Sequence, residues 1–482
     1  MGRSMSRVRV IPAVVAVAAL VLSGCTKPAP TPTPSGNLTP PGVFGPGADG
    51  LGDTYYPKAG NGGYDVANYD LDIKYDPPTD TLTGSATITA TATADLSRFN
   101  LDFTGLKTEK VTVNDVDAAA EQSGAELVVT PATGIATGAQ FVVKVAYGGV
   151  PKAFDEPGLG EIGFLHTDDG AVAIGEPEVA SSWFPVNDHP RDKATYTIKI
   201  AAPDGLAALS NGALTDKKSA GGWTTWTWSE TKPMAPYLAT VVIGKYRVKE
   251  STHDGKPMVI AVDTSLSAQV DNQMAQTPAV IDFLESKFGP YPFDALGGIV
   301  IDDRRVRFAL ENQSRPIYSW AFFEAGEDGV WVIVHELAHQ WYGDSVTVNE
   351  WKEIWLNEGF ASYAEWLWFE DKGEQSAQQT FDNFYARADA DMWRVPPGDP
   401  GKADLFHESV YTRGAMTLHA LRVTVGDDAF FKILKGWAAE KAHSNATTPE
   451  FIALAERISG KQLDQLFDEW LYGKKRPPRP GR

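Results

Sequence analysis

The stretch "VIVHELAHQWYGD", residues 332–344, places two histidines four residues apart in an apolar run, with a glutamate directly after the first. On an α-helix this spacing puts His335 and His339 about 40° apart around the axis, so their imidazoles point the same way. Glu336 is displaced by about 100°, within reach of a water at a metal held by the imidazoles but too far round to be a ligand. The stretch therefore predicts a helix that supplies two zinc ligands, His335 and His339, and a general base, Glu336.

The alternative interpretation is a pair of core histidines beside a surface glutamate. With eight histidines in the chain, the pattern arises by chance in roughly one such sequence in a hundred. The apolar neighbours Val332, Val334 and Leu337 would bury this helix, and buried histidines need hydrogen-bond partners. The metal site is therefore the favoured interpretation.

A catalytic zinc usually has three protein ligands and one open position, so a third ligand is expected downstream. Gly343 can end the first helix, and a second helix is expected over "WKEIWLNEGFASYAEWLWFE", residues 351–370. Glu358 lies on its first turns, with eighteen residues between it and His339, which suits an antiparallel helix. An exposed Glu358 is the alternative, but its setting "WLNEGFA" is apolar. We expect one Zn²⁺ per chain, bound by His335, His339 and Glu358.

The first 25 residues have the pattern of an export signal. Three arginines precede an apolar run, residues 11–21, which ends in "LSGC" at Cys25, the only cysteine of the chain. This resembles a bacterial lipobox and predicts lipidation of Cys25; an ordinary signal peptide with a chance cysteine is the alternative. We expect an exported protein, lipid-anchored to the outer face of the bacterial cytoplasmic membrane or cell envelope. Residues 26–52, rich in Pro, Thr and Gly, are expected to be an extended tether.

Composition excludes some classes of function for the folded body. The 482 residues are 43% hydrophobic and 22% charged, as in soluble globular proteins, and are enough for two or three domains. Acidic residues outnumber basic ones by 62 to 43, giving a net charge of −19. Nucleic acid is therefore not expected as a partner.

The chain changes character near residue 250. Segments such as "YDVANYDLDIKYD", residues 64–76, alternate apolar and polar residues and predict an antiparallel β domain over residues 53–247. Segments such as "AQTPAVIDFLESKFG", residues 275–289, have helical spacing and predict an α+β, mostly helical domain over residues 248–476. Residues 477–482 form a basic tail, which we expect to be solvated; contact with anionic lipid is the alternative.

"HELAHQWYGD", residues 335–344, together with "WLNEGFASYAEW", residues 355–366, resembles the M1 aminopeptidases, the gluzincin group that includes aminopeptidase N. Further matching stretches are residues 69–76, 81–103, 182–200 and 288–300. The resemblance implies a multidomain fold, with an N-terminal β-sandwich or saddle followed by a thermolysin-like catalytic domain. The chain stops where many relatives continue into a C-terminal helical domain. We therefore expect a short form without that domain, and a more open active site.

The resemblance also implies how the amino group of a substrate is held. "FALENQ" resembles the family's Gly-x-Met-Glu-Asn motif and puts Glu311 at the amine-anchoring position. "GEPEVASSWFP" puts Glu176 beside it as the contribution of the β domain. Phe308 and Leu310 stand where Gly and Met are usual, and Ile174 where Gln is usual. Phe308 must therefore point away from the substrate or reshape the rim of the site.

Two further roles are expected. "ESVYTRGAMTLHAL" resembles the family's Val-Tyr-x-Lys-Gly-Ala segment, which implies that Tyr411 stabilises the oxyanion and that Arg413 replaces the lysine. Glu353 is expected to accept a hydrogen bond from a metal-bound histidine, because such histidines commonly donate their other ring nitrogen to a carboxylate. The histidines expected to be structural or on the surface are His166, His189, His253, His407, His419 and His443.

Together these features predict a zinc metallo-aminopeptidase that removes residues from peptides with a free N-terminus. The alternatives are a thermolysin-like endopeptidase, an epoxide hydrolase on the same zinc site, and a non-enzymatic binding lipoprotein. The presence of His335, Glu336, His339 and Glu358 favours an enzyme. The first-residue preference and the oligomeric state are not predicted.

Overall fold

The computed structural model describes residues 43–323 and 329–481. Val43–Arg482 form one compact unit. The predicted signal peptide with Cys25, and the tether up to residue 42, lie outside the described residues. Among the helices that the structure describes, none is long and apolar enough to cross a membrane.

The N-terminal β domain is built on a large sheet with the strand order β15-β16-β13-β2-β3-β9-β5-β6. Its strands are β2 (Tyr64–Asp76), β3 (Thr81–Ala92), β5 (Lys107–Val113), β6 (Val116–Asp117), β9 (Gln140–Gly149), β13 (Ala194–Pro203), β15 (Ala213–Ala220) and β16 (Trp223–Met234). Alternate side chains of β2 and β3 are buried, as their sequence pattern predicts. The pairing is antiparallel except in the middle, where β13 runs parallel to β2, with Ile198 opposite Leu71. The large sheet of the predicted antiparallel domain therefore contains one parallel pair.

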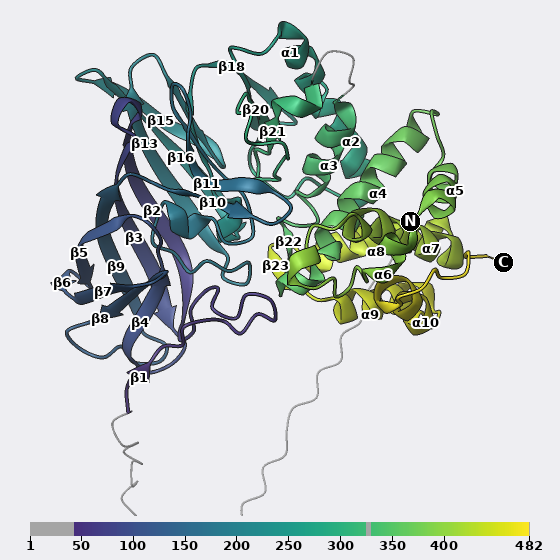
Figure 1. The fold of residues 1–482 in the computed structure, drawn as a ribbon, viewed down its shortest axis with the longest axis horizontal. Helices are drawn as coiled ribbons and strands as arrows, with labels where there is room; N and C mark the ends of the chain where they lie inside the picture. Colours follow the sequence, from purple (N-terminus) through teal and green to yellow (C-terminus); the bar gives the residue numbers. More distant parts are fainter. Residues whose placement is uncertain (1–42, 324–328, 482) are drawn as a thin grey trace, which may run out of the picture. The chain divides into compact units, whose positions relative to one another are not determined.

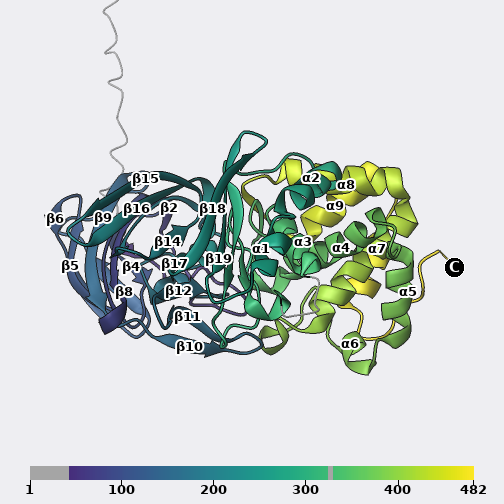
Figure 2. The same cartoon turned by 90° about the horizontal axis from the view of Figure 1, so that it is seen from above.

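Two smaller sheets complete the β domain. The first has the order β1-β4-β8-β7 and the second β10-β11-β12-β17-β14. Their strands are β1 (Gly45–Pro46), β4 (Leu96–Asp102), β7 (Ala119–Ser123), β8 (Glu126–Thr130), β10 (Ala153–Glu156), β11 (Gly160–His166), β12 (Ala171–Ile174), β14 (Ala207–Ser210) and β17 (Val241–Gly244). Figure 2 shows the large sheet on one side of this domain and β10, β11 and β12 on the other.

The second half is α+β and mostly helical, as predicted. Its sheet has the order β18-β19-β20-β21, with β18 (Tyr246–His253), β19 (Lys256–Asp263), β20 (Leu296–Ile301) and β21 (Ile317–Ser319). Because β18 pairs with β19, the strand that straddles the predicted boundary at residue 247 belongs to this half. A short parallel pair, β22 (Val346–Val348) and β23 (Ser444–Ala446), joins two loops of the half.

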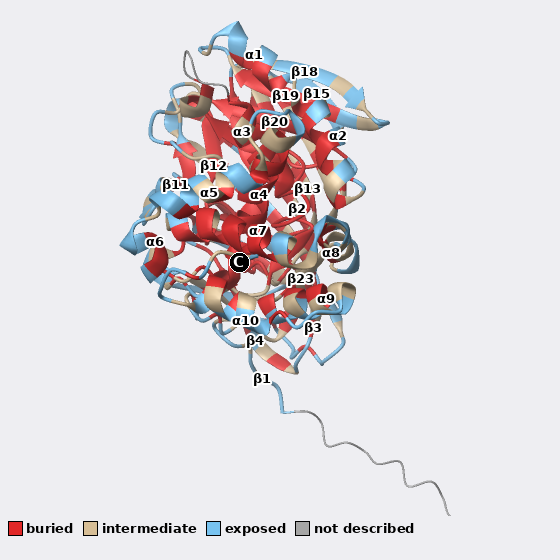
Figure 3. Cartoon of the chain, turned by 90° about the vertical axis from the view of Figure 1, so that its right-hand side faces the viewer, coloured by how far each residue is buried: buried red, intermediate tan, exposed pale blue. Residues whose placement is uncertain are grey.

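The helices follow or flank this sheet (Figure 1). They are α1 (Ala268–Met274), α2 (Thr277–Phe288), α3 (Val330–Ala338), α4 (Trp355–Asp371), α5 (Ala377–Arg387), α6 (Ala390–Arg394), α7 (Gly414–Val425), α8 (Asp427–Glu440), α9 (Thr448–Ser459) and α10 (Asp464–Phe467). Local sequence explains both ends of α9: Thr447 and Glu450 form a capping box that starts it, and Gly460, in the left-handed conformation, follows its end. Figure 3 shows α4 and α7 almost entirely buried, so they form the core of this half.

The segment before the first long strand fastens the two halves together. Asp53, fully buried, accepts hydrogen bonds from the backbone N–H groups of Tyr55, Tyr56 and Trp351, at 2.8–2.9 Å. Its other contact is His189 Nε2 at 3.3 Å, within the β domain. One carboxylate therefore contacts both the β domain and the catalytic half.

The basic tail is partly docked rather than solvated. The Arg476 guanidinium lies 4.0 Å from the ring centre of Tyr385 on α5, and the Tyr385 hydroxyl donates to the Pro477 carbonyl at 2.7 Å. Arg479 forms an ion pair with Asp382, also on α5. The expectation of a solvated tail is therefore wrong for Pro477, which is buried, and for Arg479, which is partly buried, whereas Arg476 and Pro478 are exposed.

Candidate active site

Two helices bring the predicted metal ligands together. His335 lies in the last turn of α3, His339 directly follows that helix, and Glu358 lies in the first turn of α4. Glu358 Oε2 is 3.2 Å from His335 Nε2 and 3.4 Å from His339 Nε2. One ligand atom of each residue lies within 4.8 Å of the other two, and all three side chains are buried. The structure thus places Glu358 where the sequence predicted.

Close backbone packing explains how α4 delivers Glu358. Gly359 lies against Gly414 at the start of α7, and a Cβ atom added to Gly359 would lie 3.0 Å from the Cα atom of Gly414. Two glycines therefore allow α4 and α7 to touch backbone to backbone beside the site. This contact was not predicted from the sequence, because neither glycine signals which helix it packs against.

The donor set fits zinc. Two imidazole nitrogens and one carboxylate oxygen form a common set for a catalytic zinc with an open fourth position. Although burial disfavours its charge, the imidazoles of His339 and His335 lower the pKa of Glu358 to about 2. Glu358 is therefore ionised and able to ligate a cation at neutral pH.

The other ring nitrogens of both histidines have partners. His335 Nδ1 lies 2.6 Å from Glu365 Oε1, and His339 Nδ1 lies 3.0 Å from the Tyr342 carbonyl oxygen. Both contacts engage Nδ1, so Nε2 of each imidazole is the atom that faces Glu358. Carboxylate and carbonyl partners of this kind orient metal-bound histidines. Burial opposes protonation of His335, but bonding to Glu358 and Glu365 raises its pKa well above the usual value.

The prediction for Glu353 is wrong. Its Oε1 accepts a hydrogen bond from the Thr448 backbone N–H at 2.8 Å, so it caps α9 instead. The residue that contacts His335 is Glu365, seven positions after Glu358. The sequence carried a signal for this, because residues seven apart lie on the same face of a helix.

Glu336 is buried in the same site. One of its carboxylate oxygens lies within 4.8 Å of ligand atoms of both Glu311 and His339. Burial raises the pKa of Glu336 to about 8, although the two imidazoles oppose the rise. The side chain therefore faces the region between the metal ligands and Glu311, where a base would act.

Glu176 and Glu311 form a buried pair of carboxylates. Glu311 Oε1 accepts a hydrogen bond from Tyr237 at 3.0 Å, whereas Glu176 Oε2 has no hydrogen-bond partner among the described residues. Burial and the neighbouring Glu311 raise the pKa of Glu176 well above its usual range. A buried carboxylate without a partner is costly, and a cationic group held between the two acids would relieve that cost.

Tyr411 lies in a π-helical turn, Ser409–Arg413, and its ring stacks against His335 with ring centres 6.1 Å apart. Burial raises the pKa of Tyr411 well above 10, so the hydroxyl stays protonated and can donate. Arg413 holds the turn in place. Its guanidinium donates to the carbonyls of Trp470, Trp393, Val395, Glu469 and Gly473 at 2.6–3.4 Å.

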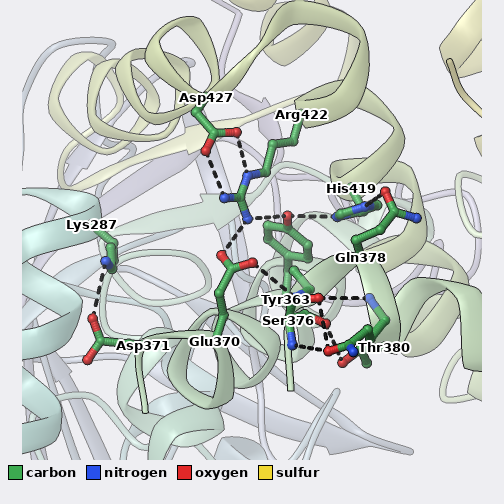
Figure 4. Close-up of polar contacts among 12 residues, drawn as sticks. Lys287, Tyr363, Glu370, Asp371, Ser376, Gln378, Thr380, His419, Arg422 and Asp427 are labelled. Carbon is green, nitrogen blue, oxygen red and sulfur yellow. Dashed lines mark hydrogen bonds and ion pairs between the residues drawn. The ribbon is translucent and has the colours of Figure 1, made fainter. Parts of the chain in front are cut away.

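A polar network fixes α4 at the end away from the metal ligands (Figure 4). Arg422 on α7 donates to Glu370 at 2.8 Å and to both oxygens of Asp427, at 2.9 and 3.0 Å. Tyr363 on α4 bonds to His419 Nδ1 at 3.1 Å. Burial and Arg422 lower the pKa of His419 to about 4, so it is a neutral, structural histidine.

The predicted residues share one cavity of about 380 Å³. Those that line it are Glu176, Glu311, His335, Glu336, His339, Glu358 and Tyr411. Phe308, which is half-buried, also lines the cavity. Ile174 and Leu310 are buried and are not among the lining residues.

Comparison with known families agrees with this geometry. Residues 272–470 match the peptidase family M1 domain, and residues 66–238 match the peptidase M1 N-terminal domain. The chain belongs to peptidase family M1.

Among curated proteins, the chain is similar to aminopeptidase M1 of Arabidopsis thaliana, with 28% identity over 64% of this chain and 37% of the relative. It is also similar to glutamyl aminopeptidase of Sus scrofa, with 29% identity over 62% of this chain and 34% of the relative. The chain thus spans little more than a third of the length of these relatives.

Among solved structures, it is similar to an M1 zinc metallopeptidase of Deinococcus radiodurans. The TM-score is 0.81 and the identity 29%, over 89% of this chain and 98% of the other. A substituted form of that enzyme was solved with a Tyr-Ser-Ala substrate, with a TM-score of 0.82 and 28% identity over 89% of this chain and 99% of the other. The chain is also similar to a substituted two-domain M1 zinc metallopeptidase bound to L-tryptophan, with a TM-score of 0.82 and 28% identity over 90% of this chain and 100% of the other. The two-domain fold class predicted from the sequence is therefore confirmed.

Proposed function

We propose that this protein is a zinc aminopeptidase that removes the first residue of peptides with a free N-terminus, with one Zn²⁺ per chain. The observation that carries the proposal is the carboxylate pair Glu176 and Glu311, buried in the same cavity as the His335–His339–Glu358 triad. The triad accounts for hydrolysis in general. The carboxylate pair explains why a substrate must carry a protonated amino group.

The side chains of the cavity divide the work. Glu176 and Glu311 hold the ammonium group through charge-assisted hydrogen bonds, which orients the first peptide bond towards the triad. Glu336 takes a proton from the attacking water and returns it to the leaving amine. The Tyr411 hydroxyl donates a hydrogen bond to the carbonyl oxygen as negative charge develops there. When bound, zinc supplies Lewis acidity for this reaction.

An endopeptidase is less well supported by the same geometry. An endopeptidase must accept chain on both sides of the scissile bond, whereas here two buried acids lie on one side of the triad. Neutral backbone held against Glu176 would leave its carboxylate without a cationic partner. Names of similar proteins, aminopeptidase M1 and glutamyl aminopeptidase, support the same choice.

The test uses the full-length protein and reporter amides of single amino acids, with and without a zinc chelator. We expect turnover that the chelator abolishes and that zinc restores. A peptide with an acetylated N-terminus should stay intact; its cleavage would favour the endopeptidase. The variant Glu336→Ala should lose turnover while the zinc content per chain is unchanged. If the protein turned over none of the substrates with a free amine, the result would favour the alternative of a non-enzymatic binding lipoprotein.

We also propose that the protein is an exported lipoprotein, anchored through lipid on Cys25 and carried on a tether that ends before Gly45. The expectation that the tether extends to residue 52 is wrong, because Gly45–Pro46 (β1) pair with β4 and Leu51 bonds to the Ala59 carbonyl. The support is the sequence alone: the arginines, the apolar run and "LSGC" of residues 1–25. Expression in a bacterial host should place the protein in the membrane fraction, labelled by a fatty-acid probe. Cys25→Ala should remove the label, and a label that persists would contradict the proposal.

A further inference from the structure

The active-site cavity has two ends, which the two histidines distinguish. Glu311 lies on the side of His339, since their ligand atoms and that of Glu336 lie within 4.8 Å of one another. Glu365 lies on the side of His335, at 2.6 Å from its Nδ1 atom. The amine-holding end is therefore next to His339, and the end next to His335 is free for the rest of a substrate.

Four aromatic rings stand at the end next to His335. Trp331 lies one turn before His335 on the same face of α3, and Trp366 directly follows Glu365 on α4. The other two are Phe322 and Phe384. All four line the cavity, and we call them the aromatic wall.

The rings of the aromatic wall support each other in pairs. The Trp366 and Phe384 rings are nearly parallel, 11° apart, with centres separated by 5.6 Å. The Phe322 and Trp331 rings meet edge to face with centres 5.4 Å apart. Trp366 is 4% exposed, but Phe384 is 37% exposed, a large apolar surface left open at the cavity. Such a surface is suited to a large apolar side chain.

The length of the site tells which residue of a substrate meets this wall. The positions of Trp331, His335 and His339 are spaced by one helical turn each, so Trp331 lies about 12 Å along α3 from His339. A peptide advances by about 3.5 Å per residue. A substrate with its amine beside Glu311 places its first peptide bond at the triad and its second Cα atom about 5 Å from the amine. A large second side chain extends about another 5–6 Å from that Cα atom and so reaches the wall, whereas a small one stops short of it.

We propose that the aromatic wall is the subsite for the second residue of the substrate, and that it selects large apolar side chains there. The inference rests on the proposed aminopeptidase function. It names the position that follows the scissile bond, so the side chain that the wall binds leaves with the shortened peptide. Burying such a side chain rather than glycine favours the reaction by about 10- to 100-fold in kcat/KM.

The test is a set of tripeptides Ala-Xaa-Ala in which Xaa is Gly, Ala, Leu or Phe. We expect kcat/KM to rise from Gly to Leu and Phe by at least about tenfold. Equal values for all four peptides overturn the inference while leaving the proposed function intact. Absence of cleavage of every peptide, including single-residue reporter amides, would instead count against the proposed function.

Substitution in the wall tests which subsite it forms. Phe384→Ala, chosen because the side chain is partly exposed and its loss is compatible with folding, should lower the Phe-to-Gly ratio at the second position at least about threefold. Phe384→Tyr should keep the ratio. Phe431→Ala, which removes a half-buried ring of α8 away from the cavity, is the matched control and should also keep it. A second panel, Xaa-Ala-Ala, should give the same first-residue profile for Phe384→Ala and the parent. A change confined to that panel would assign the wall to the first residue and overturn the inference.

Discussion

Gly359 on α4 and Gly414 on α7 meet backbone to backbone, and this contact brings Glu358 and Tyr411 to the same cavity. Gly359→Ala would place a methyl group 3.0 Å from the Cα atom of Gly414. We expect the free energy of unfolding to fall by about 1–3 kcal/mol, because neither backbone can yield without moving a helix. Activity should fall further than stability, since Glu358 would shift relative to the histidines. The control is Gly45→Ala, where an added Cβ atom has no neighbour within 4 Å; equal effects of the two changes would argue against the contact.

Glu365, rather than Glu353, should support metal binding. Glu365→Gln keeps an acceptor for His335 but removes its charge, so we expect zinc affinity to fall by about 10- to 100-fold. Competition with a chromogenic chelator measures the affinity. Glu353→Gln should leave the affinity unchanged and weaken only the cap at Thr448. Loss of affinity in Glu353→Gln alone would reverse this assignment.

Glu176→Gln should separate amine binding from metal binding. The variant removes one charge from the pair that holds the ammonium group, and charge-assisted hydrogen bonds contribute about 1.5–3 kcal/mol. We expect kcat/KM for Ala-Leu-Ala to fall by about 10- to 150-fold with the zinc content unchanged. Unchanged kcat/KM would mean that the amine is held elsewhere.

Arg413 should not be replaceable by lysine. Its planar guanidinium reaches five carbonyls, and an ammonium group has only three donors on a single atom. Arg413→Lys is therefore expected to lower the free energy of unfolding by about 1–3 kcal/mol, measured by denaturant titration. A variant as stable as the parent would show that the lost carbonyl contacts are not needed.

The lowered pKa of Asp53 predicts that the folded protein loses stability in acid. Burial opposes its ionisation, but bonds from His189 and from the N–H groups of Trp351, Tyr56 and Tyr55 lower its pKa from 3.8 to about 2. Because the pKa of Asp53 is lower in the folded than in the unfolded protein, its ionisation stabilises the fold at pH values above the unfolded pKa. This stabilisation is lost as the pH falls from about 4 through 2. The contribution is about 2 kcal/mol. Comparing the parent with Asp53→Asn between pH 2 and 7 tests it: the difference in unfolding free energy should shrink in acid.

The sequence predicted the parts of the site that depend on local periodicity. His335, Glu336 and His339 lie on one helix, and the place of Glu358 follows from a second helix that returns at a short distance along the chain. Resemblance to the family added Glu176, Glu311 and Tyr411, which come from three separate segments that no local pattern connects.

What the sequence did not predict depends on contacts between distant segments. The pattern of β13 shows a strand but not that it lies parallel to β2, because alternation of side chains is the same in either direction. Glu353 is buried and Glu365 is partly buried, both lie close to the ligands in the sequence, and the direction of each side chain decides which one contacts His335. The docking of Arg476 and Arg479 on α5 likewise depends on where that helix lies.

Glu176 Oε2, which has no hydrogen-bond partner within residues 43–323 and 329–481, has a practical consequence for handling the protein. Because Glu176 lines the cavity, we expect it to bind primary ammonium ions that fit, including the protonated form of common amine buffers such as Tris. Kinetic constants measured in such buffers would contain a competitive component, and buffers built on tertiary amines or phosphate would avoid it.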